Sequence, residues 1–186
     1  MIGPFVYEDG AYRARLTAPH TTLFIQLVRE ILVVLDEPAE LSSVVSATTG
    51  LETRRDIPEE RALEHLLPPM SLDPDDASSL RAMTEDFLRA EKSSRLRRAQ
   101  LMLEKCEHLD LGEIAISEDE VWEWLGALND IRLGLAGELS LQTDEDVVRI
   151  EELAGQAPVG THEQSAAAIY MIITWWQDSL ISTLNS

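Results

Sequence analysis

The chain has 186 residues, 45% of them apolar, which is the size of one domain that buries about 70% of its unfolded surface. Its 34 acidic and 15 basic residues give a net charge of −19, which disfavours binding to nucleic acid and to anionic lipid. The one cysteine, Cys106, rules out an internal disulfide and the paired cysteines of a zinc ribbon. Because we find neither a signal peptide nor an apolar run of ~20 residues, we expect a single cytoplasmic domain over residues 1–186 and no membrane contact.

The N-terminal residues predict a β-hairpin. Residues 5–7 and 11–16 flank an Asp-Gly pair, which favours a tight hairpin turn because glycine accepts a positive φ. Since two strands alone are marginally stable, we expect residues 113–116 to add a third. The side chains expected on the buried faces of the hairpin are Phe5, Tyr7, Tyr12, Ala14 and Leu16.

Helical spacing of apolar residues dominates the remainder, so the predicted fold class is mostly α, a compact multi-helix domain with this small antiparallel hairpin. Thr161 and Gln164 form a capping box that begins the last helix. We expect helices over residues 21–35, 41–47, 58–67, 143–154 and 162–184, in addition to a long helix and a central helix between residues 73 and 139.

A long helix is predicted between Asp73 and Cys106. Asp73 can cap it, and Pro74 suits its first turn. Because the apolar stripe shifts at Ser93-Ser94, we expect a kink or break there. The apolar residues assigned to the core are Leu80, Met83, Phe87 and Leu88 in the first half and Leu96, Ala99, Leu103 and Cys106 in the second.

The central helix, residues 117–139, begins with a predicted capping box of Ser117 and Glu120. Arg132 lies in the middle of its apolar face and should need a carboxylate partner, for which Glu85 or Asp86 is the first choice. Replacing Arg132 by leucine is then expected to strand a buried acid. The residues that define the apolar face are Val121, Trp124, Leu125, Leu128, Ile131, Leu135 and Leu139.

The opposite face of this helix carries Gly126, Asp130, Gly134 and Gly137. Each interior glycine costs about 1 kcal/mol relative to alanine, so several on one face predict that another element packs close to the backbone. The enclosed Asp130 would then need a cation, with Arg89 or Lys92 as candidates. Alternatively, the glycines lie at the surface, or the helix ends near Gly134.

Several blocks of the sequence together resemble one family. The most specific is Trp-Leu-x-Ala-Leu-Asn-Asp-x-Arg-Leu at residues 124–133, and the others are residues 10–12, 66–68, 80–89 and 170–180. On these residues the chain resembles the actinobacterial DUF2017 family. The resemblance implies a fold but no activity, and it implies genes that often neighbour one for a small adaptor of the Clp protease. Some members carry a transcriptional-regulator label, although these residues contain no helix-turn-helix signal.

Charged residues of the long and central helices form the one polar constellation considered as a candidate binding site. We weigh two interpretations: an ion-pair network that fixes the register of the helices, and a charged pocket for a small anion or a peptide terminus. The candidate residues are Arg81, Glu85, Arg89, Asn129, Asp130 and Arg132.

Catalytic and metal-binding patterns were not found. The four histidines lie near helix ends, and no nucleophile elbow, phosphate loop or dinucleotide fingerprint is present. Glu104, Cys106 and His108 do not supply the Glu-x-x-His pairs of a ferritin-like site. We therefore expect no catalytic residue, no metal and no cofactor.

Taken together, the sequence predicts a non-enzymatic interaction or regulatory protein linked to Clp-type protein turnover. Its partner would be a protein that contacts the acidic surface and the aromatic C-terminal helix, where Met171, Ile172 and Trp175 lie off the core face. That helix is also the candidate surface for a homodimer. The alternatives are a sensor of a small anion or peptide terminus and a transcription-related regulator.

Overall fold

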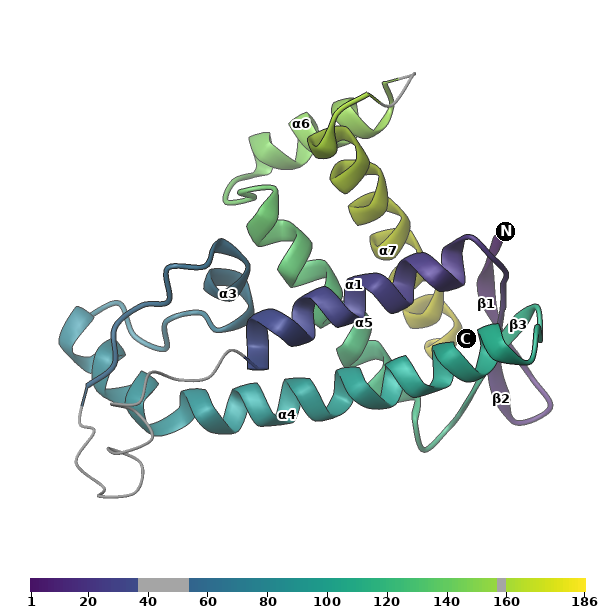
Figure 1. Ribbon diagram of the computed structural model, residues 1–186, viewed down its shortest axis with the longest axis horizontal. Helices are drawn as coiled ribbons and strands as arrows, with labels where there is room; N and C mark the ends of the chain where they lie inside the picture. Colours follow the sequence, from purple (N-terminus) through teal and green to yellow (C-terminus); the bar gives the residue numbers. More distant parts are fainter. Residues whose placement is uncertain (37–53, 157–159) are drawn as a thin grey trace.

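The computed structural model describes residues 1–36, 54–156 and 160–186 (Figure 1). The predicted fold class, mostly helical with a hairpin extended by a third strand, is confirmed, and the short helix expected at 41–47 lies outside the described residues. The described elements are β1 (Ile2–Glu8), β2 (Ala11–Leu16), α1 (His20–Asp36), α3 (Arg61–Leu66), α4 (Pro74–His108), β3 (Glu113–Ser117), α5 (Val121–Glu138), α6 (Asp144–Ala154) and α7 (His162–Leu184).

The three strands form an antiparallel sheet in the order β1-β2-β3. Asp9 and Gly10 both have positive φ, 52° and 74°, as the predicted tight hairpin turn requires. Phe5, Ala14 and Leu16 are buried as expected. Tyr7 is not, because it lies next to the turn, where its hydroxyl donates a hydrogen bond to the exposed Glu118.

Trp176 is the centre of the core. Its ring stacks on Phe5 and Phe24 at centroid distances of 5.0 and 4.8 Å and meets the edge of Trp124 at 6.1 Å. Its Nε1 donates to the carbonyl of Gly3 at 3.1 Å. The Trp176 side chain of α7 therefore contacts α1, α5 and the first strand. Hydrogen bonds also join residues 3–5 to residues 176–183, near the other end of the chain.

Figure 1 shows α1 lying along α4, while α5 and α7 lead away from this pair towards α6. A smaller apolar cluster that includes Ile150 and Ala167 holds α6 against α7. None of the helices in the described ranges combines the length and the apolar character that crossing a membrane requires.

The long helix α4 begins as predicted and runs without the expected break. Asp73 accepts hydrogen bonds from the backbone N–H groups of Asp75 and Asp76, each at 3.0 Å. At the expected break, the buried Ser93 donates to Asp36 at 2.8 Å, at the end of α1. The shift in the apolar stripe thus reflects a polar contact between helices rather than an interruption of the helix.

The two halves of α4 differ in what they bury. In the second half, the predicted core residues Leu96, Ala99, Leu103 and Cys106 are buried. In the first half, Leu80, Met83 and Phe87 are exposed, and the charged Arg81 and Glu85 are buried in their place. The prediction for these three apolar residues was therefore wrong.

The capping boxes of α6 and α7 are present, but the one predicted for the central helix is incomplete. The hydroxyl of Ser117 contacts the carboxylate of Glu120 at 2.6 Å without accepting from the Glu120 backbone N–H. Ser117 instead ends β3, and α5 begins at Val121.

Candidate functional site

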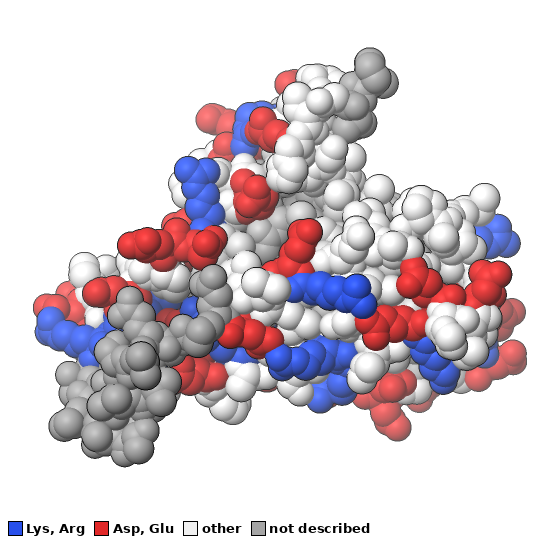
Figure 2. Space-filling view, viewed as in Figure 1, with Lys and Arg blue, Asp and Glu red and all other residues white. Residues whose placement is uncertain are grey.

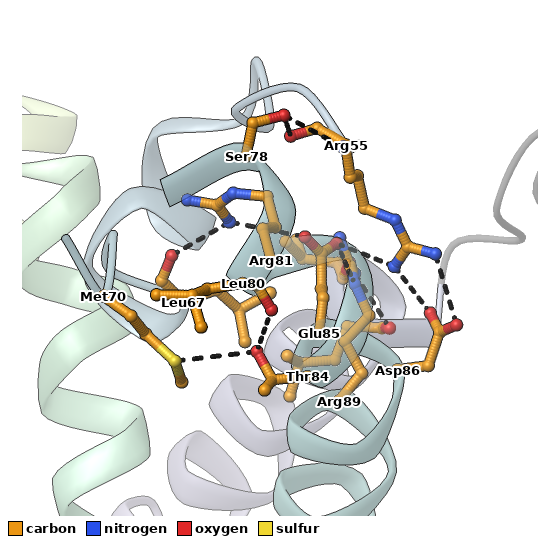
Figure 3. Close-up of polar contacts among 12 residues, drawn as sticks. Arg55, Leu67, Met70, Ser78, Leu80, Arg81, Thr84, Glu85, Asp86 and Arg89 are labelled. Atoms are coloured by element: carbon orange, nitrogen blue, oxygen red, sulfur yellow. Dashed lines mark hydrogen bonds and ion pairs between the residues drawn. The ribbon is translucent and has the colours of Figure 1, made fainter. Parts of the chain in front are cut away.

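Three of the six candidate residues meet on the inner face of α4. Arg81, Glu85 and Arg89 follow one another at intervals of four, so their side chains share one side of the helix. Arg81 Nη1 donates to Glu85 Oε2 at 3.3 Å, and Arg89 Nε donates to Glu85 Oε1 at 2.8 Å. Figure 3 shows both guanidinium groups directed at the carboxylate of Glu85. We call Arg81, Glu85 and Arg89, together with Arg55 and Asp86, the Glu85 cluster.

The outer contacts of the Glu85 cluster tie α4 to its neighbours. Arg81 Nη1 also donates to the carbonyl of Leu67 at 3.1 Å, just after α3. Arg89 Nη1 donates to the carbonyls of Val34 and Leu35, at 3.2 and 3.1 Å. These are two of the last carbonyls of α1, which lack partners within their own helix and favour a cation.

Arg55 brings the segment before α3 to the same place. Its guanidinium donates to both carboxylate oxygens of Asp86, at 2.7 and 3.2 Å, and lies 3.9 Å from Glu85. This hydrogen bonding lowers the pKa of Asp86 below its ordinary value. The ion pair of Asp86 with Arg55 therefore persists to more acidic pH than the ordinary pKa of an aspartate would allow.

The Glu85 cluster leaves little room for a ligand. The cavity beside Arg81 and Glu85 has a volume of about 10 Å³, which holds one water molecule at most. The geometry therefore favours the interpretation as an ion-pair network that sets the register of α1, α3 and α4. Binding of an anion or a peptide terminus at these residues stays a prediction.

Asp130 forms a second buried cluster between α5 and α4, and its side chain is 1% exposed. Lys92 Nζ lies 2.6 Å from Asp130 Oδ1, and Arg95 Nε donates to Oδ2 at 2.9 Å. Lys92 was one of the two expected partners. Arg89, the other, binds Glu85 instead.

Arg95 is the residue of this cluster that sequence reasoning missed. Its side chain lies over Gly126, where an added Cβ would come within 2.7 Å of Nη1 and 2.8 Å of Cδ. Gly126 lies one helical turn before Asp130, so the missing side chain makes room for the arginine that reaches the carboxylate. The sequence contains one sign of this contact, because the glycine at position 126 stands four residues before Asp130.

Arg132 does not have the expected carboxylate partner. Its Nη2 donates to Asn129 Oδ1 at 2.9 Å, within the same helix, and it makes no ion pair within the part of the chain that the structure describes. Glu85 and Asp86 are already bound by other arginines. Asn129 and Arg132 therefore stand apart from both charged clusters.

Replacing Arg132 by leucine is consequently expected to change the free energy of unfolding by no more than about 0.5 kcal/mol, because no buried acid loses its partner. Urea unfolding followed by circular dichroism measures the change. Arg81→Leu is the contrast, since it removes one of the cations that hold Glu85 and should cost about 3 kcal/mol. Equal losses in both variants would mean that Arg132 has an acid partner after all.

The close packing predicted for the glycine face of α5 is confirmed, with a different neighbour at each glycine. An added Cβ at Gly134 would lie 3.1 Å from Ile31 of α1. At Gly137 it would lie 2.8 Å from the Cα of Ala62 in α3. Because α5 continues to Glu138, the alternative that the helix ends near Gly134 is wrong.

Glu104 and Cys106, which were considered for a metal site, contact different groups. Glu104 accepts from Arg29 and Gln100, at 2.7 and 2.8 Å. Burial raises the pKa of the Cys106 thiol, whose Sγ lies 3.2 Å from the Glu113 carbonyl. Within residues 1–36, 54–156 and 160–186, no three His, Cys, Asp or Glu side chains are grouped to hold a metal ion.

Comparison with known proteins gives one match. The model of the family described as Domain of unknown function (DUF2017) matches residues 2–184. No curated protein and no solved structure matches the chain. The family description assigns no activity.

Proposed function

Because the chain belongs to the DUF2017 family, whose description assigns no activity, we propose from its geometry that it is a non-enzymatic interaction protein that binds a partner through α4. The observation that carries this proposal is the exposure of Leu80, Met83 and Phe87, which we call the α4 stripe. Their spacing of three and four residues places them on one side of the helix. Met83 and Phe87 are 79% and 71% exposed.

The α4 stripe is exposed because the other side of the helix is occupied by the Glu85 cluster. A helix at the surface normally turns its apolar side inward and its charges outward, and this half of α4 does the reverse. Single exposed apolar residues are ordinary, whereas a row at helical spacing is typical of a docking surface. Met70, which is also exposed, adds apolar surface next to Thr84, whose hydroxyl lies 3.6 Å from Met70 Sδ.

The C-terminal helix remains a second candidate for contacts, including those of a homodimer. Trp175 and Ile181 are exposed on α7, but Met171 and Ile172 are half-buried. The helix thus offers less apolar surface than its composition indicates, which is why we place the main contact on α4.

Through the family resemblance, we propose that the partner belongs to Clp-type protein turnover in the cytoplasm. The alternative of an anion sensor finds less support, because the space beside Arg81 is about 10 Å³. A transcription-related regulator would have to act through a bound protein rather than through DNA. Figure 2 supports this view, since basic and acidic side chains are interspersed on the face it shows, without a continuous basic patch.

A photo-crosslinking amino acid placed at Met83 in native cells tests the proposal, with the same amino acid at Leu101 as the control. Leu101 is 66% exposed on the same helix, and it lies about 27 Å from Met83 along the axis. We expect a discrete adduct from position 83 that position 101 does not give, and its mass identifies the partner. Identical adducts from both positions, or none from position 83, would contradict the proposal.

A further inference from the structure

A second surface has the properties of a docking site, and it does not depend on the α4 stripe. It is a groove of about 380 Å³ where α1 faces α5 and α7. Leu27 and Ile31 of α1, Leu135 of α5 and Ala166 of α7 form its apolar floor. Figure 2 shows the surface hollowed where α1 passes below α5 and α7, with acidic side chains at the margin.

Small residues create this groove. Gly134 lets α5 come close to α1, because an added Cβ there would lie 3.1 Å from Ile31 Cδ1. Ala62 and Ala166, which also line the groove, present only methyl groups to it. The small side chains at these positions therefore leave space above the apolar floor that larger ones would fill.

The rim of the groove is acidic. Glu30 of α1 and Glu138 of α5 are exposed at its edge. Neither makes an ion pair with another described residue. Glu85 and Asp130, in contrast, each bind at least two basic side chains. Among the described residues of the lining, His162 is the one that can carry a positive charge. An apolar floor between two carboxylates is complementary to an apolar side chain flanked by lysine or arginine.

We propose that this groove binds a short amphipathic segment of a partner protein, with apolar side chains on the floor and Lys or Arg side chains directed at Glu30 and Glu138. Its volume lies near the lower end of the range for ligand sites, about 300–1,000 Å³, so it accommodates a few side chains rather than a domain. A second copy of this chain fits poorly, because it would bring another net charge of −19 against an acidic rim. Anionic lipid and nucleic acid are opposed by the same charge.

The test is a titration of the full chain, labelled with ¹⁵N, with a synthetic helical peptide that carries leucine on one face and lysine on both flanks. We expect backbone amide shifts confined to the parts of α1, α5 and α7 that line the groove. The double variant Glu30→Gln/Glu138→Gln should weaken peptide binding roughly three- to tenfold. Both positions are exposed, so the variant should fold normally.

The matched control is Glu8→Gln/Asp119→Asn, which removes the same charge from exposed positions at the end of β1 and just after β3. Equal weakening in both double variants would show non-specific attraction and overturn the proposal. Shifts confined to the α4 stripe would overturn it while supporting the proposed function. Groove shifts that depend on protein concentration without peptide would assign the groove to a homodimer, which also overturns it.

Discussion

Replacing Asp130 by asparagine is expected to lower the free energy of unfolding by about 3 kcal/mol. The substitution keeps the size of the side chain and removes its charge, so that Lys92 and Arg95 lose their common partner. Breaking a buried ion pair by removing one partner costs about 3–5 kcal/mol. We place the loss at the lower end, because Lys92 and Arg95 are 14% and 20% exposed and can recover part of their hydration. Urea unfolding with linear extrapolation gives the value.

Glu123→Gln provides the matched control for this prediction. It removes a carboxylate from the same helix and from an ion pair with another arginine of α4, at 2.6 Å. Arg98 and Glu123 are 54% and 51% exposed, so the pair should contribute no more than about 1 kcal/mol. A loss for Asp130→Asn no larger than that for Glu123→Gln would mean that burial adds nothing to the Asp130 cluster.

The substitution Gly137→Ala is expected to destabilise the fold even though alanine favours helices. Helix propensity alone predicts a gain of about 1 kcal/mol. The added Cβ, however, would lie 2.8 Å from the Cα of Ala62, 2.9 Å from the carbonyl carbon of Arg61 and closer still to its oxygen. These are backbone atoms, so α3 must move as a unit. We expect a net loss of about 3 kcal/mol, which lowers Tm by roughly 6–12 °C.

Gly155→Ala is the control for the backbone contact. Gly155 has an ordinary φ of −79°, and the atom nearest to an added Cβ is 3.5 Å away. Alanine should therefore be neutral there or stabilise by up to about 1 kcal/mol, through the lower entropy of the unfolded chain. If Gly137→Ala raised Tm as well, the approach of α3 to α5 would be looser than the distances indicate.

Local signals in the sequence predict the elements well. The caps at Asp73 and Thr161 and the Asp-Gly turn each depend on a few adjacent residues, whose hydrogen bonds do not need the remainder of the fold. The predictions of these caps and of the turn succeed because their physical cause lies within the segment. The third strand is different, because it followed from the instability of an isolated hairpin and pairs with residues about 100 positions away.

The partners of charged residues could not be predicted in the same way. In the first half of α4, two rows have helical spacing, the α4 stripe and the row Arg81–Glu85–Arg89. The usual rule puts the apolar row inside. Here two arginines neutralise one glutamate, and the carbonyls that end α1 accept from Arg89, so the charged row is buried instead. For the same reason Arg132 was given a partner that other arginines already hold.

The packing of β1 against α7 determines when the core can close during synthesis. The inner face of β1 is covered by a tryptophan that lies 173 residues further along the chain than the carbonyl it binds. A nascent chain that has not yet added α7 leaves Phe5 and Phe24 without the ring on which they stack. Contacts of such long sequence separation slow folding. We therefore expect the core around Phe5 and Phe24 to form only after α7 has been translated.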